Sequence, residues 1–266
     1  MATHGHDMIR DGVRKRYAAI ALTSGAGCGC SDQSCCSPSR APSAKTLSAG
    51  LGYSEAELNA APSGANMGLG CGNPQAIALL RKGEVVVDLG AGGGFDCFLA
   101  ASQVGRRGRV IGIDMTPEMV GKARKNARKA GNTNVEFRLG EIEHMPVADN
   151  TADVILSNCV INLTPDKPQV YSEAWRILKP GGRLAISDVV AVRRIPAAMK
   201  RDFEKHSGCV AGAATVEELK RILRNAGFRN ISVTPSSESV LFIKSWFPGS
   251  GVEKYVRSAN VQATKP

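Results

Sequence analysis

Eight cysteines are the side chains of this 266-residue chain best suited to chemistry. Residues 1–21 are charged and lack a continuous apolar run, so they indicate neither a secretory signal nor a membrane span. We therefore expect a cytoplasmic protein. Thiols in a reducing compartment rarely form a disulfide framework, and their number instead favours metal, metalloid or redox chemistry. The cysteines are Cys28, Cys30, Cys35, Cys36, Cys71, Cys97, Cys159 and Cys209.

The four N-terminal cysteines lie in residues 23–52, a stretch rich in Gly, Ser and Ala that almost lacks large apolar side chains. Such a composition predicts a mobile loop. Two C-x₂-C pairs would indicate a structural zinc site, whereas here a C-x-C pair precedes the adjacent Cys35 and Cys36. Two interpretations stay open: a soft-metal site, or a flexible loop with redox-active thiols.

Three further cysteines, Cys71, Cys159 and Cys209, lie in segments that contain Gly or Asn. Cys97 differs from them, because it falls on a predicted helix and is expected to be a small buried hydrophobe. Whether the other three meet in space depends on the secondary structure around them.

A strand, a tight turn and a helix are predicted over residues 84–104. Residues 85–89 suit a strand buried on both faces, and residues 95–104 repeat apolar side chains at helical spacing. The turn between them contains alternate glycines, which let the backbone approach a ligand without interference from a Cβ atom. We expect a nucleotide-like ligand here.

The glycine spacing indicates the class of ligand. A dinucleotide site needs G-x-G-x-x-G, whereas this turn reads D-L-G-x-G-x-G from Asp88 through Gly90, Gly92 and Gly94. That pattern resembles the first motif of the S-adenosylmethionine-dependent methyltransferases. A second predicted strand ends in Asp114, whose carboxylate is placed to accept hydrogen bonds from two ribose hydroxyls.

The remaining pattern predicts an α/β fold, a Rossmann-like seven-stranded and mostly parallel sheet with flanking helices. The turn Lys179-Pro180-Gly181-Gly182 is a further resemblance to the same methyltransferases. After the first two strands, further strands are expected at residues 135–139, 151–159, 183–190, 231–234 and 240–245.

The ends of these strands should meet. In an open parallel sheet, ligands bind beyond the carboxyl ends of the strands. Gly90, Asp114, Glu141 and Cys159 all follow or end a predicted strand, so we expect them to converge on one edge of the sheet. The loop that contains Glu141 is placed to reach an adenine.

Three parts of the chain are predicted. Residues 1–52 comprise an N-terminal helix and the Cys-rich loop, and residues 53–247 form the methyltransferase domain. A helical insertion at about residues 191–214 contains Cys209. Residues 248–266 are polar and are expected to form a frayed tail.

Helix starts are marked by capping residues. Ser54 with Glu57 and Thr215 with Glu218 have the spacing of capping boxes. Thr116 is expected to cap a helix that has Pro117 at its first position.

Five motifs follow one another along the chain, at residues 66–74, 95–98, 114–117, 157–163 and 208–212. Together they resemble the arsenite methyltransferases, in the expected order from about residue 53 to 245. The resemblance implies methyl transfer from S-adenosylmethionine to trivalent arsenic, for detoxification. It implies that Cys71, Cys159 and Cys209 bind the arsenic and that an N-terminal cysteine, here Cys35 or Cys36 with Cys28 and Cys30 nearby, assists a redox step.

The resemblance also implies a cofactor site and a reductant. Methylated arsenic is formally pentavalent, and a thiol pair returns it to the trivalent state by forming a disulfide. Thioredoxin or glutathione is therefore an expected partner that restores the thiols. The residues expected to bind S-adenosylmethionine are Asp88, Gly90, Gly92, Gly94, Asp114, Met115, Glu141, Ile142 and Asn158.

The chemistry of arsenic fits these residue types. Trivalent arsenic is soft and thiophilic, and three thiolates give a pyramidal complex with a free lone pair. Because the lone pair is itself the nucleophile, no general base is needed. The sequence accordingly shows no recognisable Ser-His-Asp or Cys-His relay.

Two other functions stay open. The chain could methylate carbon or oxygen of a small molecule, with the cysteines incidental, or it could sequester metalloid with a vestigial cofactor pocket. The net charge of +10 is dispersed and no base-stacking motif accompanies it, so we expect neither a nucleic acid nor a membrane as partner. We expect a monomer.

Overall fold

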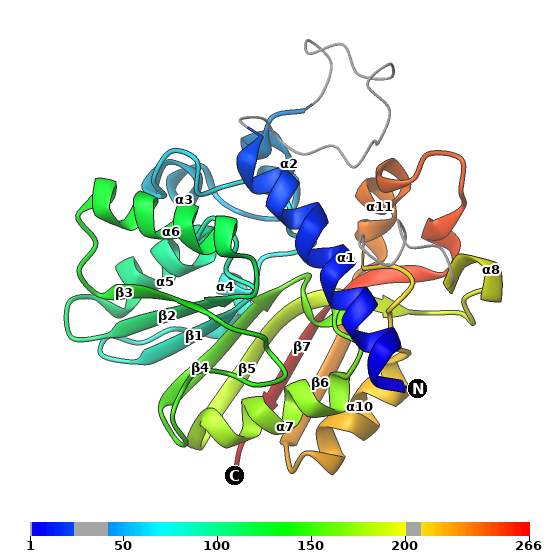
Figure 1. Ribbon diagram of the computed structural model, residues 1–266. Coiled ribbons are helices and arrows are strands. Elements are labelled where there is room, and N and C mark those ends of the chain that lie inside the picture. Colours follow the sequence, from blue (N-terminus) through cyan, green and yellow to red (C-terminus); the bar gives the residue numbers. More distant parts are fainter. Residues whose placement is uncertain (1, 24–41, 201–208) are drawn as a thin grey trace.

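The computed structural model describes residues 2–23, 42–200 and 209–266 (Figure 1). Its centre is a seven-stranded sheet in the order β3-β2-β1-β4-β5-β7-β6, in which β7 runs antiparallel to both of its neighbours. This arrangement confirms the predicted Rossmann-like, mostly parallel sheet. The strands are β1 (Val85–Leu89), β2 (Arg109–Asp114), β3 (Val135–Leu139), β4 (Ala152–Asn158), β5 (Leu178–Ala191), β6 (Arg229–Pro235) and β7 (Val256–Thr264).

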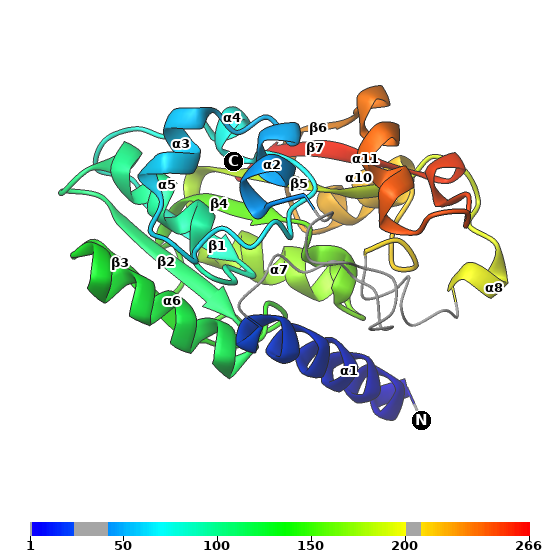
Figure 2. The ribbon, with the colours of Figure 1, turned by 90° about the horizontal axis from the view of Figure 1, so that it is seen from above.

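Helices cover both faces of the sheet and its carboxyl edge (Figures 1 and 2). The helices are α1 (Ala2–Leu22), α2 (Ala44–Gly50), α3 (Glu55–Ala60), α4 (Gln75–Ala78), α5 (Phe95–Val104), α6 (Pro117–Ala130), α7 (Lys167–Ile177), α8 (Ala197–Lys200), α10 (Val216–Asn225) and α11 (Val240–Trp246). Short 3₁₀ turns are η1 (Ile161–Leu163), η2 (Ser237–Ser239) and η3 (Val252–Lys254).

Alternate side chains of the central strands enter two different cores. In β1, Val86 packs with apolar residues of α4, α5 and α6, whereas Val87 and Leu89 pack with those of α7 and α10. All three valine and leucine side chains are fully buried. Because both faces of the strand are covered, its apolar run is continuous, as the sequence predicted.

A third core lies over the carboxyl ends of β4 and β5. It combines Val13 of α1 and Ile243 of α11 with the buried cysteines Cys71, Cys159 and Cys209. The end of α1 meets α6, where Lys122 Nζ donates a hydrogen bond to the Ala21 carbonyl oxygen at 3.0 Å. The N-terminal helix therefore lies across the edge where ligands of such sheets bind (Figure 1).

Local capping sets several of these helices. Both predicted capping boxes are present, since Ser54 and Thr215 each exchange hydrogen bonds with the glutamate three residues later. Thr116 occupies the position before α6 and Pro117 the first helical position, but the Thr116 side chain makes no capping hydrogen bond, so that part of the prediction is wrong. Its backbone N–H instead donates to the Asp114 carboxylate.

The seventh strand lies elsewhere than predicted. Residues 240–245 belong to the helix α11, whose apolar side chains point in different directions, with Ile243 buried and Leu241 81% exposed. The last strand is β7, in the stretch predicted to fray, and it pairs with β5 from Val256 to Thr264. The sheet therefore continues past the expected boundary at residue 247, and the frayed tail is wrong.

The expected loop over residues 23–52 also needs correction at one end. Ala44–Gly50 form α2, because the Ser43 hydroxyl accepts a hydrogen bond from the Thr46 N–H and caps the helix. Cys28, Cys30, Cys35 and Cys36 lie outside the described residues, as do residues 201–208 of the predicted insertion. Within the insertion, Ala197–Lys200 form the short helix α8.

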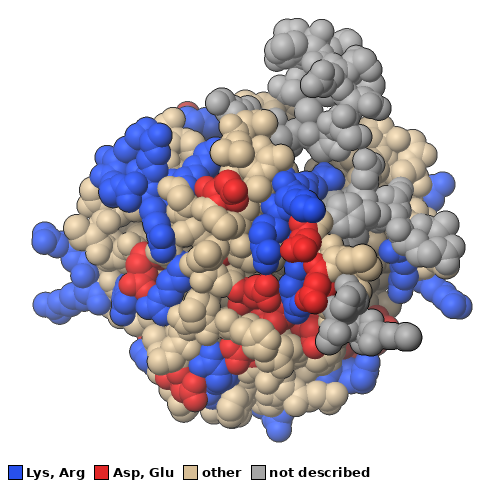
Figure 3. All heavy atoms as spheres, viewed as in Figure 1, with Lys and Arg blue, Asp and Glu red and all other residues tan. Residues whose placement is uncertain are grey.

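Charged side chains are distributed over the surface in mixed sign. On the face shown in Figure 3, Lys and Arg are interleaved with Asp and Glu and do not gather in a single basic band. Among the described helices, none combines the length and the hydropathy that crossing a bilayer requires.

Candidate active site

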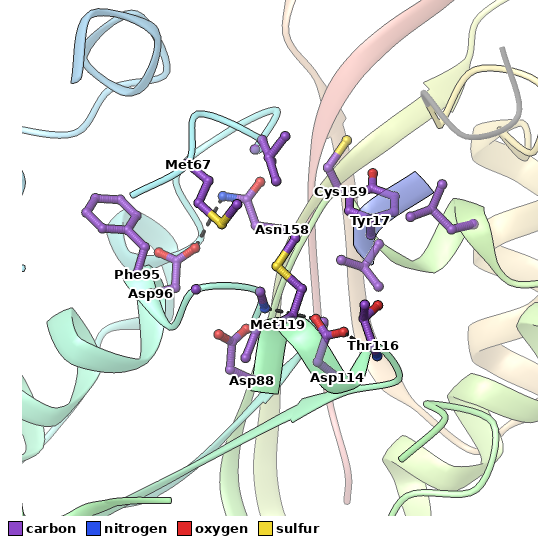
Figure 4. A pocket seen from close by; sticks show the side chains of 18 of the residues that line it. Tyr17, Met67, Asp88, Phe95, Asp96, Asp114, Thr116, Met119, Asn158 and Cys159 are labelled. Atoms are coloured by element: carbon purple, nitrogen blue, oxygen red, sulfur yellow. Dashed lines mark hydrogen bonds between the residues drawn. The ribbon is translucent and has the colours of Figure 1, made fainter. Parts of the chain in front are cut away.

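One pocket lies at the carboxyl ends of β1, β2 and β4 and extends to the cysteine cluster (Figure 4). The glycine turn and Asp114 line it on one side, and Cys159 lines it on the other. Tyr17 and Val13 of α1 also line it. A single cavity thus connects the predicted cofactor site with one of the predicted arsenic ligands.

The glycine turn is fixed by its neighbours. The Gly90 and Ala91 N–H groups both donate to the Ile113 carbonyl oxygen, at 2.8 and 2.9 Å. Gly90 has a φ of 70°, and a Cβ atom there would lie 2.4 Å from Val160 Cγ2. A Cβ atom on Gly92, by contrast, would meet nothing within 4 Å. The turn therefore leaves open space beside its backbone on the pocket side, as a nucleoside-like ligand requires.

Asp114 stands at the end of β2 with its carboxylate tied to the turn. Its Oδ2 atom accepts the Gly92 N–H at 2.9 Å, and its Oδ1 atom accepts the Thr116 N–H at 2.8 Å. Burial raises the pKa of Asp114, although these two backbone hydrogen bonds lower it in part. Each oxygen keeps a second lone pair, so the carboxylate can still accept two ligand hydroxyls.

Asn158, at the end of β4, links the two halves of the pocket. Its Oδ1 atom accepts the Cys71 N–H at 3.0 Å, and its Nδ2 group donates to the Gly72 carbonyl oxygen at 2.9 Å. The same Nδ2 group lies 3.0 Å from Tyr53 Oη and 3.3 Å from Asp96 Oδ2. One amide therefore positions the Cys71 segment against the cofactor side.

Two buried carboxyl groups lie behind the turn. Burial raises the pKa of Asp88, and the charge of Asp96 raises it further, while the Cys97 thiol donates to Asp88 Oδ2 at 3.2 Å. Asp96 accepts the Tyr53 hydroxyl at 2.7 Å. Both carboxyl groups line the pocket. Cys97 is fully buried, in a different core from Cys71, Cys159 and Cys209, which confirms that it is a small buried hydrophobe.

Three cysteines from separate segments come together. Cys71, Cys159 and Cys209 are 1%, 7% and 2% exposed and belong to one core. The Cys209 Sγ atom donates to the Cys159 carbonyl oxygen at 2.9 Å, and the Cys71 Sγ atom lies 3.6 Å from the Ser187 carbonyl oxygen. The sulfurs of Cys71 and Cys159 and a carboxylate oxygen of Asp188 all lie within 4.8 Å of one another.

The surroundings keep these thiols protonated. Burial raises the pKa of Cys71 to about 11. The pKa of Cys209 is raised first by hydrogen bonding to Cys159 and then by burial. A hydrogen bond with Cys209 lowers the pKa of Cys159, but its contact with Cys71 and its burial raise that pKa more. Cys159 therefore interacts with both Cys71 and Cys209.

Two of these cysteines have unusual backbone angles. Cys159 has a φ of 59° and Cys209 a φ of 64°, in the left-handed region that side chains with a Cβ atom rarely adopt. Strained residues of this kind cluster at functional sites, because the surrounding structure must hold them in place. The fold thus holds two thiols in a conformation that local sequence disfavours.

Helix α1 covers the junction between turn and thiols. Burial raises the pKa of Tyr17, and the neighbouring Cys209 and Cys159 raise it further. Tyr17 lies beside Cys159 in the pocket (Figure 4). Arg10 Nη2 lies 3.1 Å from Glu143 Oε1, and Arg10 Nε lies 3.4 Å from Glu141 Oε2. Arg14 Nη2 lies 3.3 Å from Glu141 Oε1. These ion pairs hold the helix over the pocket.

The predicted site residues are thus mostly brought together. Asp88, Gly90, Gly92, Asp114, Met115, Ile142, Asn158 and Cys159 line the pocket. Gly94 begins α5 behind the turn, and Cys71 and Cys209 lie in the adjoining core. Glu141 does not line the pocket; it pairs with the arginines of α1. Cys35 and Cys36 lie outside the described residues.

Some residues of the site were not predicted. Tyr17, Tyr53 and Glu143 line the pocket, and Asp188 adjoins the thiols. Asp188 lies in the fifth strand, so the rule that ligands meet strand ends could have found it. No local pattern marks Tyr17 or Tyr53, because both come from helices or loops far away in the sequence.

Comparison with known proteins gives consistent matches. A model of a methyltransferase domain family matches residues 80–227. An arsenite methyltransferase of Halobacterium salinarum is 48% identical over 272 residues, covering 100% of this chain and 69% of that protein. An arsenite methyltransferase of Aquipseudomonas alcaligenes is 41% identical over 183 residues, covering 63% of this chain and 52% of that protein.

A solved structure agrees with these matches. The arsenic (III) S-adenosylmethionine methyltransferase of Chlamydomonas reinhardtii has a TM-score of 0.61 to this chain at 31% sequence identity. The comparison covers 85% of this chain and 74% of that one.

Proposed function

Since the chain belongs to the arsenite methyltransferase family, we propose that it transfers methyl groups from S-adenosylmethionine to trivalent arsenic held by Cys71, Cys159 and Cys209. The observation that supports this most is the convergence of the three cysteines beside the pocket that contains the glycine turn. Their segments lie far apart in the sequence, and a random buried cysteine has no reason to join two others.

Arsenite binding needs only the groups present. Each thiol gives its proton to an arsenic-bound hydroxyl, which leaves as water, and an As–S bond forms in its place. Three such exchanges give a neutral complex, which suits a cluster as buried as this one. Since the raised pKa of Cys71, about 11, keeps its thiol protonated before arsenic arrives, each proton moves together with its leaving hydroxide.

The residues around the glycine turn fit S-adenosylmethionine. The open space beside Gly92 admits a nucleoside, and the Asp114 carboxylate is oriented for its ribose hydroxyls. Ile142 and Met115 supply apolar surface, and Asn158 and Asp88 complete the lining. When bound, the cofactor supplies an activated methyl group on a sulfonium.

Orientation is the main contribution of this chain. Thiolates that hold arsenic at the base of the pocket direct its lone pair toward the turn, and well-oriented reactants gain up to about 7–11 kcal/mol. Tyr17 and Val13 close the α1 side, which limits the entry of water. No side chain has to act as a general base.

A reductant completes the proposed cycle. Methyl transfer leaves arsenic formally pentavalent, and two electrons from a thiol pair return it to the trivalent state as that pair becomes a disulfide. We assign one partner of the pair to Cys35 or Cys36 and the other to Cys71. Thioredoxin or glutathione would then reduce the disulfide, which places the enzyme in a reducing, cytoplasmic setting.

The test combines product analysis with cofactor binding. Reduced protein, S-adenosylmethionine and arsenite should give methylated arsenicals by chromatography with elemental detection. Cys159→Ser and Cys209→Ser should abolish methylation, while calorimetry should find cofactor affinity within a few-fold of the wild type. Cys97→Ser, a change at a buried cysteine of the opposite core, is the matched control and should stay active.

Each alternative outcome has a distinct meaning. Full activity in either serine variant refutes the thiol site. Arsenite binding without methylated product favours sequestration, and methylation of a quinone-like acceptor without arsenic favours a carbon or oxygen methyltransferase.

A further inference from the structure

Beside the three thiols lies a carboxylate for which the proposed arsenic chemistry has no use. Asp188 of β5 is 5% exposed, and one of its oxygens lies within 4.8 Å of the sulfurs of both Cys71 and Cys159. Trivalent arsenic with three thiolates is already neutral, so a further anionic ligand gives it no advantage. The carboxylate therefore suggests a second class of ligand for the same site.

The geometry suits a tetrahedral cation. Zinc binds thiolate sulfur at about 2.3 Å, which places two sulfurs of one tetrahedral site about 3.8 Å apart. The donors of Cys71, Cys159 and Asp188 lie within 4.8 Å of one another, so contraction of about 1 Å or less brings them to bonding distance. A water can take the fourth position, since the Cys209 Sγ atom lies outside this set and donates to the Cys159 carbonyl oxygen.

Neighbouring groups fix the carboxylate. Asp188 Oδ1 accepts the Val189 N–H at 2.7 Å and the Asn162 Nδ2 group at 2.9 Å. Its Oδ2 atom accepts the Asn162 N–H at 3.3 Å, and a backbone hydrogen bond from Ile161 also lowers the pKa of this carboxyl group. Hydrogen bonds of this kind orient the ligands of protein metal sites. The carboxylate is thus held in place beside the sulfurs.

The charge of the donor set suits a divalent ion. Two thiolates and a carboxylate carry three negative charges, and a divalent cation leaves only one of them uncompensated.

We propose that Cys71, Cys159 and Asp188 form a binding site for zinc and its soft congener cadmium, which excludes arsenite from the same thiols. On binding, the cation loses water ligands, and the two thiol protons pass to the buffer. No electron is transferred. Soft divalent cations would then act as inhibitors competitive with arsenite.

Cadmium titration tests the site directly. The starting protein has Cys28, Cys30, Cys35 and Cys36 replaced by Ser, so that only the buried thiols respond. Cadmium added to the reduced protein should produce thiolate-to-metal absorbance in the ultraviolet, saturating at one ion per chain, and zinc should displace it. Asp188→Asn should weaken cadmium binding by at least about tenfold, since it removes a ligand. Cys97→Ser should not change it.

A competition measurement keeps the result unambiguous. Arsenite added first should suppress the cadmium absorbance. If arsenite fails to compete while Asp188 still controls cadmium affinity, the arsenic assignment is wrong and the cation site stands. Cadmium binding of equal affinity in Asp188→Asn, or absorbance that survives in Cys71→Ser, overturns the proposal.

Discussion

Replacing Asn158 by Asp tests whether one amide holds the cofactor side and the thiol side of the pocket together. The Nδ2 group donates to the Gly72 carbonyl oxygen at 2.9 Å and lies 3.3 Å from Asp96 Oδ2. Oδ1 accepts the Cys71 N–H at 3.0 Å. An aspartate keeps the acceptor but turns the donor into an oxygen that faces other oxygens.

The expected cost follows from the distances. Two negative charges 3.3 Å apart repel by about 5 kcal/mol at an effective dielectric constant of ~20. One of the two carboxyl groups, that of the new aspartate or that of Asp96, should therefore stay protonated in the folded variant. Keeping a carboxyl group protonated above its ordinary pKa of about 4 costs about 1.4 kcal/mol per pH unit, or about 4 kcal/mol at pH ~7. Adding about 1 kcal/mol for a lost hydrogen bond, the free energy of unfolding should fall by about 4–5 kcal/mol.

The pH dependence has a definite sign. From about pH 4 to 7 the folded variant binds one more proton than its unfolded chain, so its deficit relative to the wild type should shrink by about 1.4 kcal/mol for each unit that the pH falls. Urea unfolding at several pH values measures this. Asn150→Asp is the matched control, because Asn150 is exposed and its Oδ1 accepts from Lys265 Nζ at 2.8 Å, so its effect should stay within about 0.5 kcal/mol. A deficit under about 1 kcal/mol in Asn158→Asp, or one independent of pH, would refute this account of the amide.

Three further changes test other parts of the site. Asp114→Ala should weaken S-adenosylmethionine binding by about 1–3 kcal/mol in calorimetry through lost ribose hydrogen bonds, and unchanged affinity would place the ribose elsewhere. Gly90→Ala should lower the free energy of unfolding by about 2–4 kcal/mol, because φ is 70° and the new Cβ would lie 2.4 Å from Val160 Cγ2. Adding Val160→Ala should restore part of the lost stability, and a double variant no more stable than Gly90→Ala would show that the clash is not the cause. Because the pKa of Cys71 is raised to about 11, the unfolded chain loses this thiol proton first, and stability should fall as the pH rises from ~8.5 toward 11. Denaturant titrations should show a smaller fall in Cys71→Ser.

Features set by neighbouring residues could be predicted from the sequence. The strand and glycine turn at residues 85–94 have a local pattern, because a doubly buried strand must be apolar and a turn with positive φ favours glycine. The capping boxes of α3 and α10 also depend on residues only three apart. These local rules placed Asp114 and Asn158 at strand ends, and the pocket is lined by both.

Features set by distant partners could not be predicted. The sequence of β7 alternates small and polar side chains and lacks a strong apolar run, and only its pairing with β5 and β6 makes it a strand. Glu141 follows β3 as expected, yet its partners Arg10 and Arg14 come from α1, more than a hundred residues earlier. The periodicity of apolar residues indicates which side chains are buried, but it does not indicate which distant segment packs against them.

The left-handed backbone at Cys159 and Cys209 sets a limit on how stable this enzyme can become. Each non-glycine residue in that conformation costs roughly 1–2 kcal/mol, and glycine would remove the cost. Glycine would also remove a buried thiol side chain at each position, so the stability gained is at most the relieved strain less the lost burial. The fold thus retains strained cysteines at two positions where glycine is conformationally easier.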